Sequence, residues 1–295
     1  MLTAFFCRAK AREALRQNPS TLLLASLLAA LPLTLSRVFL TLAMRKVPQE
    51  TLMNLYVQSL NGATVDPGVL GPMVPLLRMS LIFAAAALLT TFLTLGRIHM
   101  GLKLLRGEPV ELRDLLSRSA VWWKAPLQIL WQGLLIFLWS MVGTPLIVLA
   151  VFVRSQSLAL LLIYAGYGIS LFFGIRASLH YRLAQTALAD RPELGVRASV
   201  RESRQLLDRK KGMIFGLLVS FLGWILLSEL VPAFLPAFVG TAVSLLADLV
   251  LTVYIELAVS AFYLSLRGEG VKSALEPEAA AEEETSAAGD EEELT

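Results

Sequence analysis

The sequence predicts an all-α, polytopic membrane protein: a bundle of six transmembrane helices with two cytoplasmic amphipathic helices. Hydrophobic residues make up 56% of its 295 residues, and the mean hydropathy is +0.66. Only 17% of the residues are charged, whereas about a quarter are charged in a soluble globular domain. Several apolar runs also reach the roughly 18 residues that indicate a membrane span.

Six apolar segments are long enough to be transmembrane helices, and together they predict one membrane domain over residues 21–266. The first segment contains Pro32, which removes one backbone donor and favours a kink. The third is interrupted by Gly-Thr-Pro at 143–145. The predicted spans are 21–42, 73–96, 125–153, 157–175, 213–231 and 238–264. Residues 1–20 precede them as a short amphipathic segment.

Lys and Arg are concentrated in alternate gaps between the predicted spans. Residues 1–20 hold four, 97–124 hold six, 176–211 hold nine and the C-terminal stretch holds two, together 21 of the 26 basic residues. Basic flanks are retained in the cytoplasm because they are poorly translocated. The pattern therefore predicts six crossings with both termini in the cytoplasm.

The C-terminal stretch, 267–295, is predicted to be a disordered acidic tail. Its last part, 274–295, carries nine acidic residues and no basic residue. Without that part the chain has a net charge of +12 instead of +3. A segment so acidic and so poor in large apolar residues buries too little surface to fold alone.

A strongly basic segment, 190–212, lies between the fourth and fifth predicted spans. Val196, Val200, Ser203 and Leu207 are spaced as one stripe of a helix. A basic amphipathic helix joined to a span is expected to lie at the lipid headgroups, where it attracts anionic lipid. The candidate surface for anionic lipid, the acidic tail or a protein partner consists of Arg197, Arg201, Arg204, Arg209, Lys210 and Lys211. The alternative is a topology anchor with no other role.

Residues 97–126 resemble a weaker copy of this segment. They too contain a proline, an acidic residue and then apolar and basic residues at helical spacing. The sequence thus predicts a second amphipathic helix and a repeated span–helix–span unit over 73–139 and 157–231. Parallel repeats of this kind occur in transporters. Independent basic loops would give the same pattern.

Ionisable residues inside predicted spans are costly in a bilayer, which makes each one a functional candidate. We expect Arg78, Asp248 and Glu256 to form an intramembrane charge network, with Arg176 or His180 within reach of Glu256. Arg37 and Glu229 lie near span ends, where their charged groups can extend to water. One interpretation is a path for protons or ions through Asp248 and Glu256. The other is pairing that fixes the helices in register.

Motifs for other chemistry are absent from the sequence. There is no GxxxxGK[ST] loop, no HExxH and no GxSxG. A single cysteine and two distant histidines exclude a disulfide framework and a Cys/His metal cluster. Basic residues without a recognised nucleic-acid-binding fold do not indicate nucleic-acid binding. We expect no catalytic residues, cofactor or metal.

Residues 174–227 resemble a bacterial membrane family known as domain of unknown function 975. The features that carry the resemblance are Tyr181, "LADRP" at 188–192, the spacing of Ala198, Ser203, Arg204 and Leu206, and Gly223-Trp224. "RAKAREALRQNP" at 8–19 and "AVSAFYLSL" at 258–266 are also similar to the ends of the family. The resemblance implies a six-helix protein of the bacterial cytoplasmic membrane and brings no activity with it.

The function expected from these observations is non-catalytic. A basic cytoplasmic face in contact with the bilayer and its anionic lipids favours a membrane-organising or interaction protein. The alternative is a small-solute or ion transporter that uses Asp248 and Glu256.

Overall fold

The structure, a computed structural model, describes residues 4–44, 74–208 and 210–268. Every regular element within these ranges is a helix. The residues outside these ranges include Arg209, nearly all of the gap 43–72 between the first two predicted spans, and the predicted tail beyond residue 268.

Six helical segments in the described ranges are long and apolar enough to cross a membrane, as predicted. Most of their large apolar side chains are exposed, which suits contact with lipid. The 3-10 turn η4 (Met141–Gly143) divides the third segment at the predicted Gly-Thr-Pro break. The segments are α2 (Pro19–Met44), α5 (Val74–Leu105), α6 (Lys124–Ser140) with α7 (Thr144–Val151), α8 (Gln156–Tyr181), α11 (Lys211–Ala233) and α12 (Ala237–Leu266).

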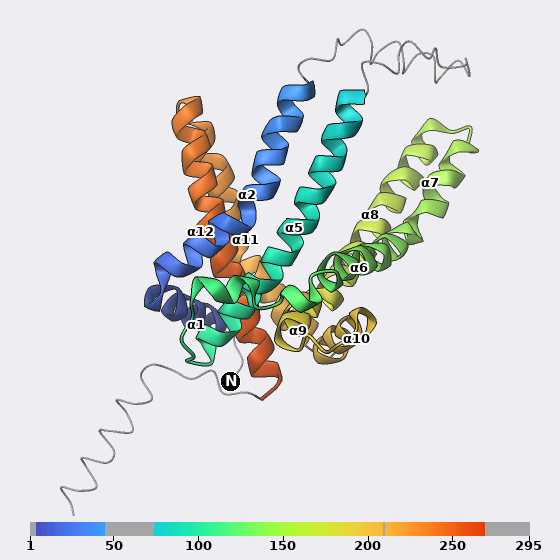
Figure 1. Ribbon diagram of the computed structural model, residues 1–295. Coiled ribbons are helices and arrows are strands. Elements are labelled where there is room, and N and C mark those ends of the chain that lie inside the picture. Colours follow the sequence, from blue (N-terminus) through green and yellow to red (C-terminus); the bar gives the residue numbers. More distant parts are fainter. Residues whose placement is uncertain (1–3, 45–73, 209, 269–295) are drawn as a thin grey trace, which may run out of the picture.

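The spans are arranged as three pairs that meet at one end and diverge toward the other (Figure 1). The pairs are α2 with α5, α11 with α12, and α6–α7 with α8. We call the end where they meet the base. It also contains α1 (Ala4–Gln17), α9 (Ala184–Asp190) and α10 (Val196–Leu207).

The tightly packed core of the protein lies toward the base. It joins α5, α9, α10, α11 and α12 through side chains that are almost completely buried, among them Leu102, Leu188, Leu207, Leu217 and Phe262. The amphipathic helix α1 adds Cys7, Ala11 and Ala14 to the same core. Burial raises the pKa of the Cys7 thiol to about 11, so it stays protonated and unreactive at neutral pH.

The prediction of an amphipathic helix over residues 97–126 is wrong. Residues 97–105 continue α5 because Met100 and Leu102 are buried in the core. Gly107 then ends the helix with a positive φ of 77°, and Glu108 N–H donates to the Lys103 carbonyl in a Schellman closure. Only the short 3-10 helices η2 (Leu112–Leu116) and η3 (Ser119–Val121) follow before α6. The proposed repeat of span, amphipathic helix and span is therefore not present.

Close backbone contact between η4 and α8 leads to a first prediction. A Cβ atom on Gly143 would overlap the carbonyl oxygen of Gly166 and lie 2.5 Å from the Ser170 hydroxyl oxygen. Backbone atoms cannot move aside without a large energetic cost. Gly143→Ala is therefore expected to lower the free energy of unfolding by about 2 kcal/mol. The measurement is thermal unfolding in detergent, followed by tryptophan fluorescence.

Gly168→Ala is the matched control, since a Cβ there meets no atom within 4 Å. It lies in α8, the helix that Gly143 contacts, and alanine is the better helix former. We expect it to keep or raise the unfolding temperature. Equal losses from the two variants would refute the close contact.

Candidate functional site

Asp190, the last residue of α9, is the centre of an ion-pair network at the base. Its side chain is only 5% exposed. One carboxylate oxygen lies 2.7 Å from Arg106, just after α5, and the other lies 2.5 Å from Arg267, just after α12. The Tyr263 hydroxyl also donates to Asp190, at 3.2 Å. One carboxylate therefore joins three helices that are distant in the sequence.

The segment after Asp190 extends this network to α6 and α10. Arg191 pairs with Glu202, whose carboxylate lies 3.4 Å from the same Tyr263 hydroxyl and shares its one proton with Asp190. The Lys124 ammonium donates to the Pro192 carbonyl at 2.7 Å. The "LADRP" motif thus folds into a structural junction, which gives a physical role to residues that carried the family resemblance.

A second buried ion pair lies between the spans. Arg97 of α5 donates to the Glu256 carboxylate of α12 at 2.5 Å and to the Ser26 hydroxyl of α2 at 2.5 Å. The side chains of Arg97 and Glu256 are 9% and 21% exposed. Their contact ties the α2–α5 pair to α12 just above the base.

The structure does not bring the three predicted intramembrane charges together. Glu256 is paired with Arg97, so the expectation that Arg176 or His180 is its partner is wrong. Asp248 precedes Glu256 by eight residues, or about 12 Å along the helix, and its side chain is exposed. Arg78 is exposed near the other end of α5. Neither Arg78 nor Asp248 forms an ion pair with a described residue.

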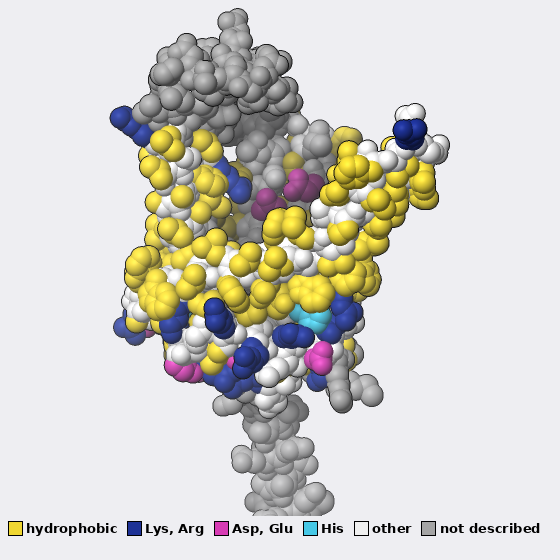
Figure 2. Space-filling model, turned by 90° about the vertical axis from the view of Figure 1, so that its right-hand side faces the viewer, with side chains coloured by type: hydrophobic (Ala, Val, Ile, Leu, Met, Phe, Trp, Pro, Cys, Tyr) yellow, Lys and Arg dark blue, Asp and Glu magenta, His cyan; other side chains and the backbone are white. Residues whose placement is uncertain are grey.

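Helix α10 presents a basic face to the outside of the base. Its predicted stripe is buried at Val200, Ser203 and Leu207 and partly buried at Val196. The basic residues Arg197, Arg201 and Arg204 are exposed. Figure 2 shows Lys and Arg side chains gathered at the base, directly below an apolar band. Of the other predicted residues, Lys210 and Lys211 are partly exposed, and Arg209 is outside the described part of the chain.

Two contacts fix the position of α10. The Ser203 hydroxyl donates to the His180 carbonyl at 2.8 Å and accepts from the Leu183 amide at 3.1 Å. It thereby satisfies backbone groups where α8 ends and α9 begins. On the other flank, the Arg197 guanidinium lies 4.9 Å from the centroid of the Trp131 ring in a cation–π contact. The basic face is therefore held rigidly against α6 and α8.

The loop after α5 is held by a further ion pair at the base. Lys103 lies 2.9 Å from the Asp114 carboxylate. Burial acts to raise the pKa of Asp114, but the Glu111 backbone N–H and the Lys103 ammonium outweigh it and keep the pKa below its ordinary value. Asp114 therefore stays ionised at neutral pH and supports the turn.

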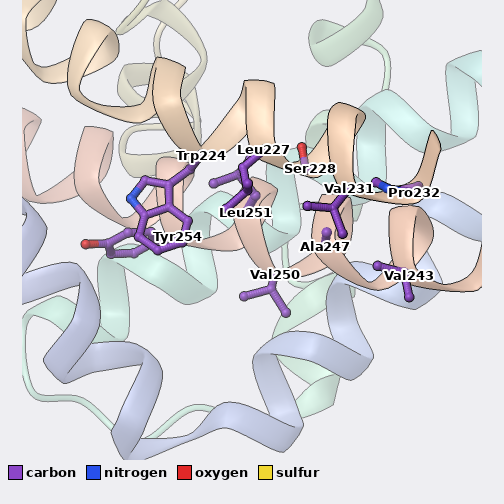
Figure 3. A pocket seen from close by; sticks show the side chains of 10 residues that line it. All are labelled: Trp224, Leu227, Ser228, Val231, Pro232, Val243, Ala247, Val250, Leu251 and Tyr254. Carbon is purple, nitrogen blue, oxygen red and sulfur yellow. The ribbon is translucent and has the colours of Figure 1, made fainter. Parts of the chain in front are cut away.

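An apolar cleft of about 410 Å³ lies between α11 and α12. Figure 3 shows Trp224 and Tyr254 at one end of it, and Val231, Pro232 and Val243 at the other. The Tyr254 hydroxyl donates to the Arg8 carbonyl at 3.3 Å. A cleft lined by apolar and aromatic side chains suits a hydrocarbon chain.

Sequence reasoning missed three residues that matter in this structure. Arg97 falls outside the second predicted span, which ends at residue 96, and so belongs to the predicted cytoplasmic segment 97–126. In the sequence, Asp190 stands out only as part of a motif, and Arg176 only as a residue within reach of Glu256. A signal was present for Arg97, since apolar residues at helical spacing continue to Leu105.

Comparison with known proteins gives a family and no activity. No curated protein and no solved structure matches the chain. Residues 1–270 match the model of a family described as "Protein of unknown function (DUF975)". Because the match covers all six spans and the whole base, the chain belongs to this family of proteins of unknown function, DUF975.

Proposed function

We propose that this protein is a non-catalytic membrane-organising or interaction protein of the bacterial cytoplasmic membrane. In this proposal both termini and the base face the cytoplasm, and the basic face of α10 attracts anionic phospholipid. The observation that carries the proposal is that Arg197, Arg201 and Arg204 project together from a helix fixed against the spans.

The charge distribution supports this orientation. The segments that hold 21 of the 26 Lys and Arg residues all begin or end at the base. The cytoplasmic leaflet carries the negative surface potential, and each Lys or Arg near it contributes about 1 kcal/mol. The three exposed arginines of α10 therefore give a substantial attraction. Any protein partner would meet the same basic surface.

Transport through Asp248 and Glu256 is not proposed as a second function. Glu256 already has a cationic partner, Arg97, and Asp248 lies about 12 Å away along the helix. A paired carboxylate of this kind supports the structural interpretation of Glu256.

The test compares two double variants that remove the same charge from opposite ends of the molecule. Each is extracted with its surrounding lipid in polymer nanodiscs, and the enrichment of phosphatidylglycerol over the bulk membrane is measured. Arg197→Gln with Arg201→Gln is expected to reduce the enrichment severalfold, because about 2 kcal/mol of attraction is lost.

The control carries Arg78→Gln with Arg154→Gln. Both arginines are exposed and lie far from the base. It is expected to keep the wild-type enrichment. The proposal fails if the α10 variant keeps that enrichment too, or if the control loses as much as the α10 variant does.

A further inference from the structure

A small polar pocket of about 160 Å³ lies beside α10 at the edge of the base. It is formed where α6, α8, α10 and α11 come together. Its cationic lining consists of Arg176, Arg204 and Lys211. Neither Arg176 nor Arg204 forms an ion pair with any described residue. Two guanidinium groups are thus available to a ligand.

One acidic residue, Asp208, also lines the pocket. It lies 3.3 Å from the Lys211 ammonium, and its side chain is 70% exposed. This contact offsets one of the three positive charges. The pocket keeps a net positive charge from Arg176 and Arg204, which selects for an anion.

The other end of the pocket is aromatic. Trp139 of α6 and Phe173 of α8 stack at 5.9 Å between ring centroids, with 8° between the ring planes. Phe173, Arg176 and His180 lie on one face of α8, so the lining runs about 10 Å along that helix. One pocket therefore has a cationic end at the base and an apolar end toward the membrane.

The positions of the polar groups are fixed by their neighbours. His180 Nδ1 donates to the Arg176 carbonyl at 2.8 Å. The Ser203 hydroxyl donates to the His180 carbonyl at 2.8 Å, so the next residue, Arg204, is held beside the end of α8. The polar groups of this pocket are therefore held in place by the contacts within α8 and between α8 and α10.

We propose that this pocket binds one phospholipid molecule, with its phosphate diester between Arg176 and Arg204. Guanidinium groups donate paired hydrogen bonds to phosphate oxygens. The acyl chains then lie along Trp139 and Phe173. Free phosphate has no acyl chain, so its binding would not need these two side chains. The inference rests on the proposed placement of the base at the headgroups, but not on the diffuse attraction by Arg197 and Arg201.

The experiment measures lipid that stays bound to the full-length protein purified in detergent. Purification is done in about 1 M salt, where the screening length of about 3 Å removes diffuse attraction. Native mass spectrometry then counts the phospholipid retained. Wild type is expected to keep one phospholipid, and Arg176→Gln with Arg204→Gln is expected to reduce occupancy at least about tenfold.

Arg197→Gln with Arg201→Gln is the matched control, because it removes the same charge from the same base. It should keep the bound lipid, although it is the variant expected to lose the nanodisc enrichment. The four arginines are exposed, so all variants should fold, and thermal unfolding checks that the control, which loses the Arg197–Trp131 contact, is as stable as wild type. If both double variants lose the lipid equally, the pocket is refuted while the proposed function stands.

Two further results would also overturn the site. Wild type that retains no phospholipid in high salt would leave the pocket without its ligand. Displacement of the lipid by inorganic phosphate, with Phe173→Ala retaining lipid as wild type does, would identify a site for free phosphate instead. The expected result is that phosphate fails to displace the lipid and that Phe173→Ala weakens its retention.

Discussion

Asp190→Asn is expected to lower the free energy of unfolding by about 3 kcal/mol. The carboxylate is buried and contacts the guanidinium groups of Arg106 and Arg267 at 2.7 and 2.5 Å. Its loss leaves two positive charges close together without the negative charge between them. It also weakens the junction between α5, α9 and α12. The measurement is the thermal unfolding midpoint in detergent, with size-exclusion chromatography to detect aggregation.

Asp208→Asn is the control for this experiment. Asp208 makes a single ion pair with Lys211, three residues on, and its side chain is 70% exposed. Exposed pairs of this type contribute about 0 to 1 kcal/mol, so the midpoint should change little. If Asp190→Asn were no more harmful than Asp208→Asn, the network at the base would not be what holds the pairs of spans together.

The membrane architecture could be predicted from the sequence because length and hydropathy decide it. A run of about 20 apolar residues has one stable conformation in a bilayer. The break in the third span was predictable from Gly143 and Pro145, and the buried stripe of α10 from its spacing. These features depend on residues close together in the chain.

The contacts between the spans could not be predicted in the same way. Arg97 falls just beyond the second predicted span because hydropathy falls where α5 approaches the base, although the same helix continues to Leu105. Its partner, Glu256, is 159 residues away. Asp190 likewise binds Arg106 and Arg267, which directly follow α5 and α12. Pairing of this kind depends on how helices pack, and no local pattern encodes it.

Only part of the lining of the pocket beside α10 could be predicted, for the same reason. Arg204 and Lys211 belong to the basic segment and could be named from the sequence. The sequence instead indicates Arg176 as a residue within reach of Glu256, although it lines the pocket with Trp139 from another span. A continuous basic segment suggests a diffuse surface, and only the packing of α6 and α8 against α10 makes a defined site.

Glu256→Gln is expected to lower the free energy of unfolding by about 3 kcal/mol, because it removes one partner of a buried ion pair. The Arg97 side chain is 9% exposed, and Glu256 is its carboxylate partner at 2.5 Å. A neutral amide leaves the guanidinium charge without compensation between α2, α5 and α12. Thermal unfolding and folded abundance in the membrane measure the effect.

Asp248→Asn is the matched control on the same helix. Asp248 is exposed and forms no ion pair with a described residue, so its neutralisation should leave the unfolding midpoint unchanged or raise it. The opposite order, a stable Glu256→Gln and an unstable Asp248→Asn, would contradict the pairing described above.

The pair of results also decides between the two functions. If Glu256→Gln alone is destabilised, Glu256 has a structural role, and transport would have to use Asp248 by itself. If both variants are as stable as wild type, two carboxylates are held in the membrane at a cost without a structural return. Proton flux into liposomes, compared between wild type and Asp248→Asn, then becomes the deciding experiment, since only a transporter loses flux when a carboxylate without a structural role is neutralised.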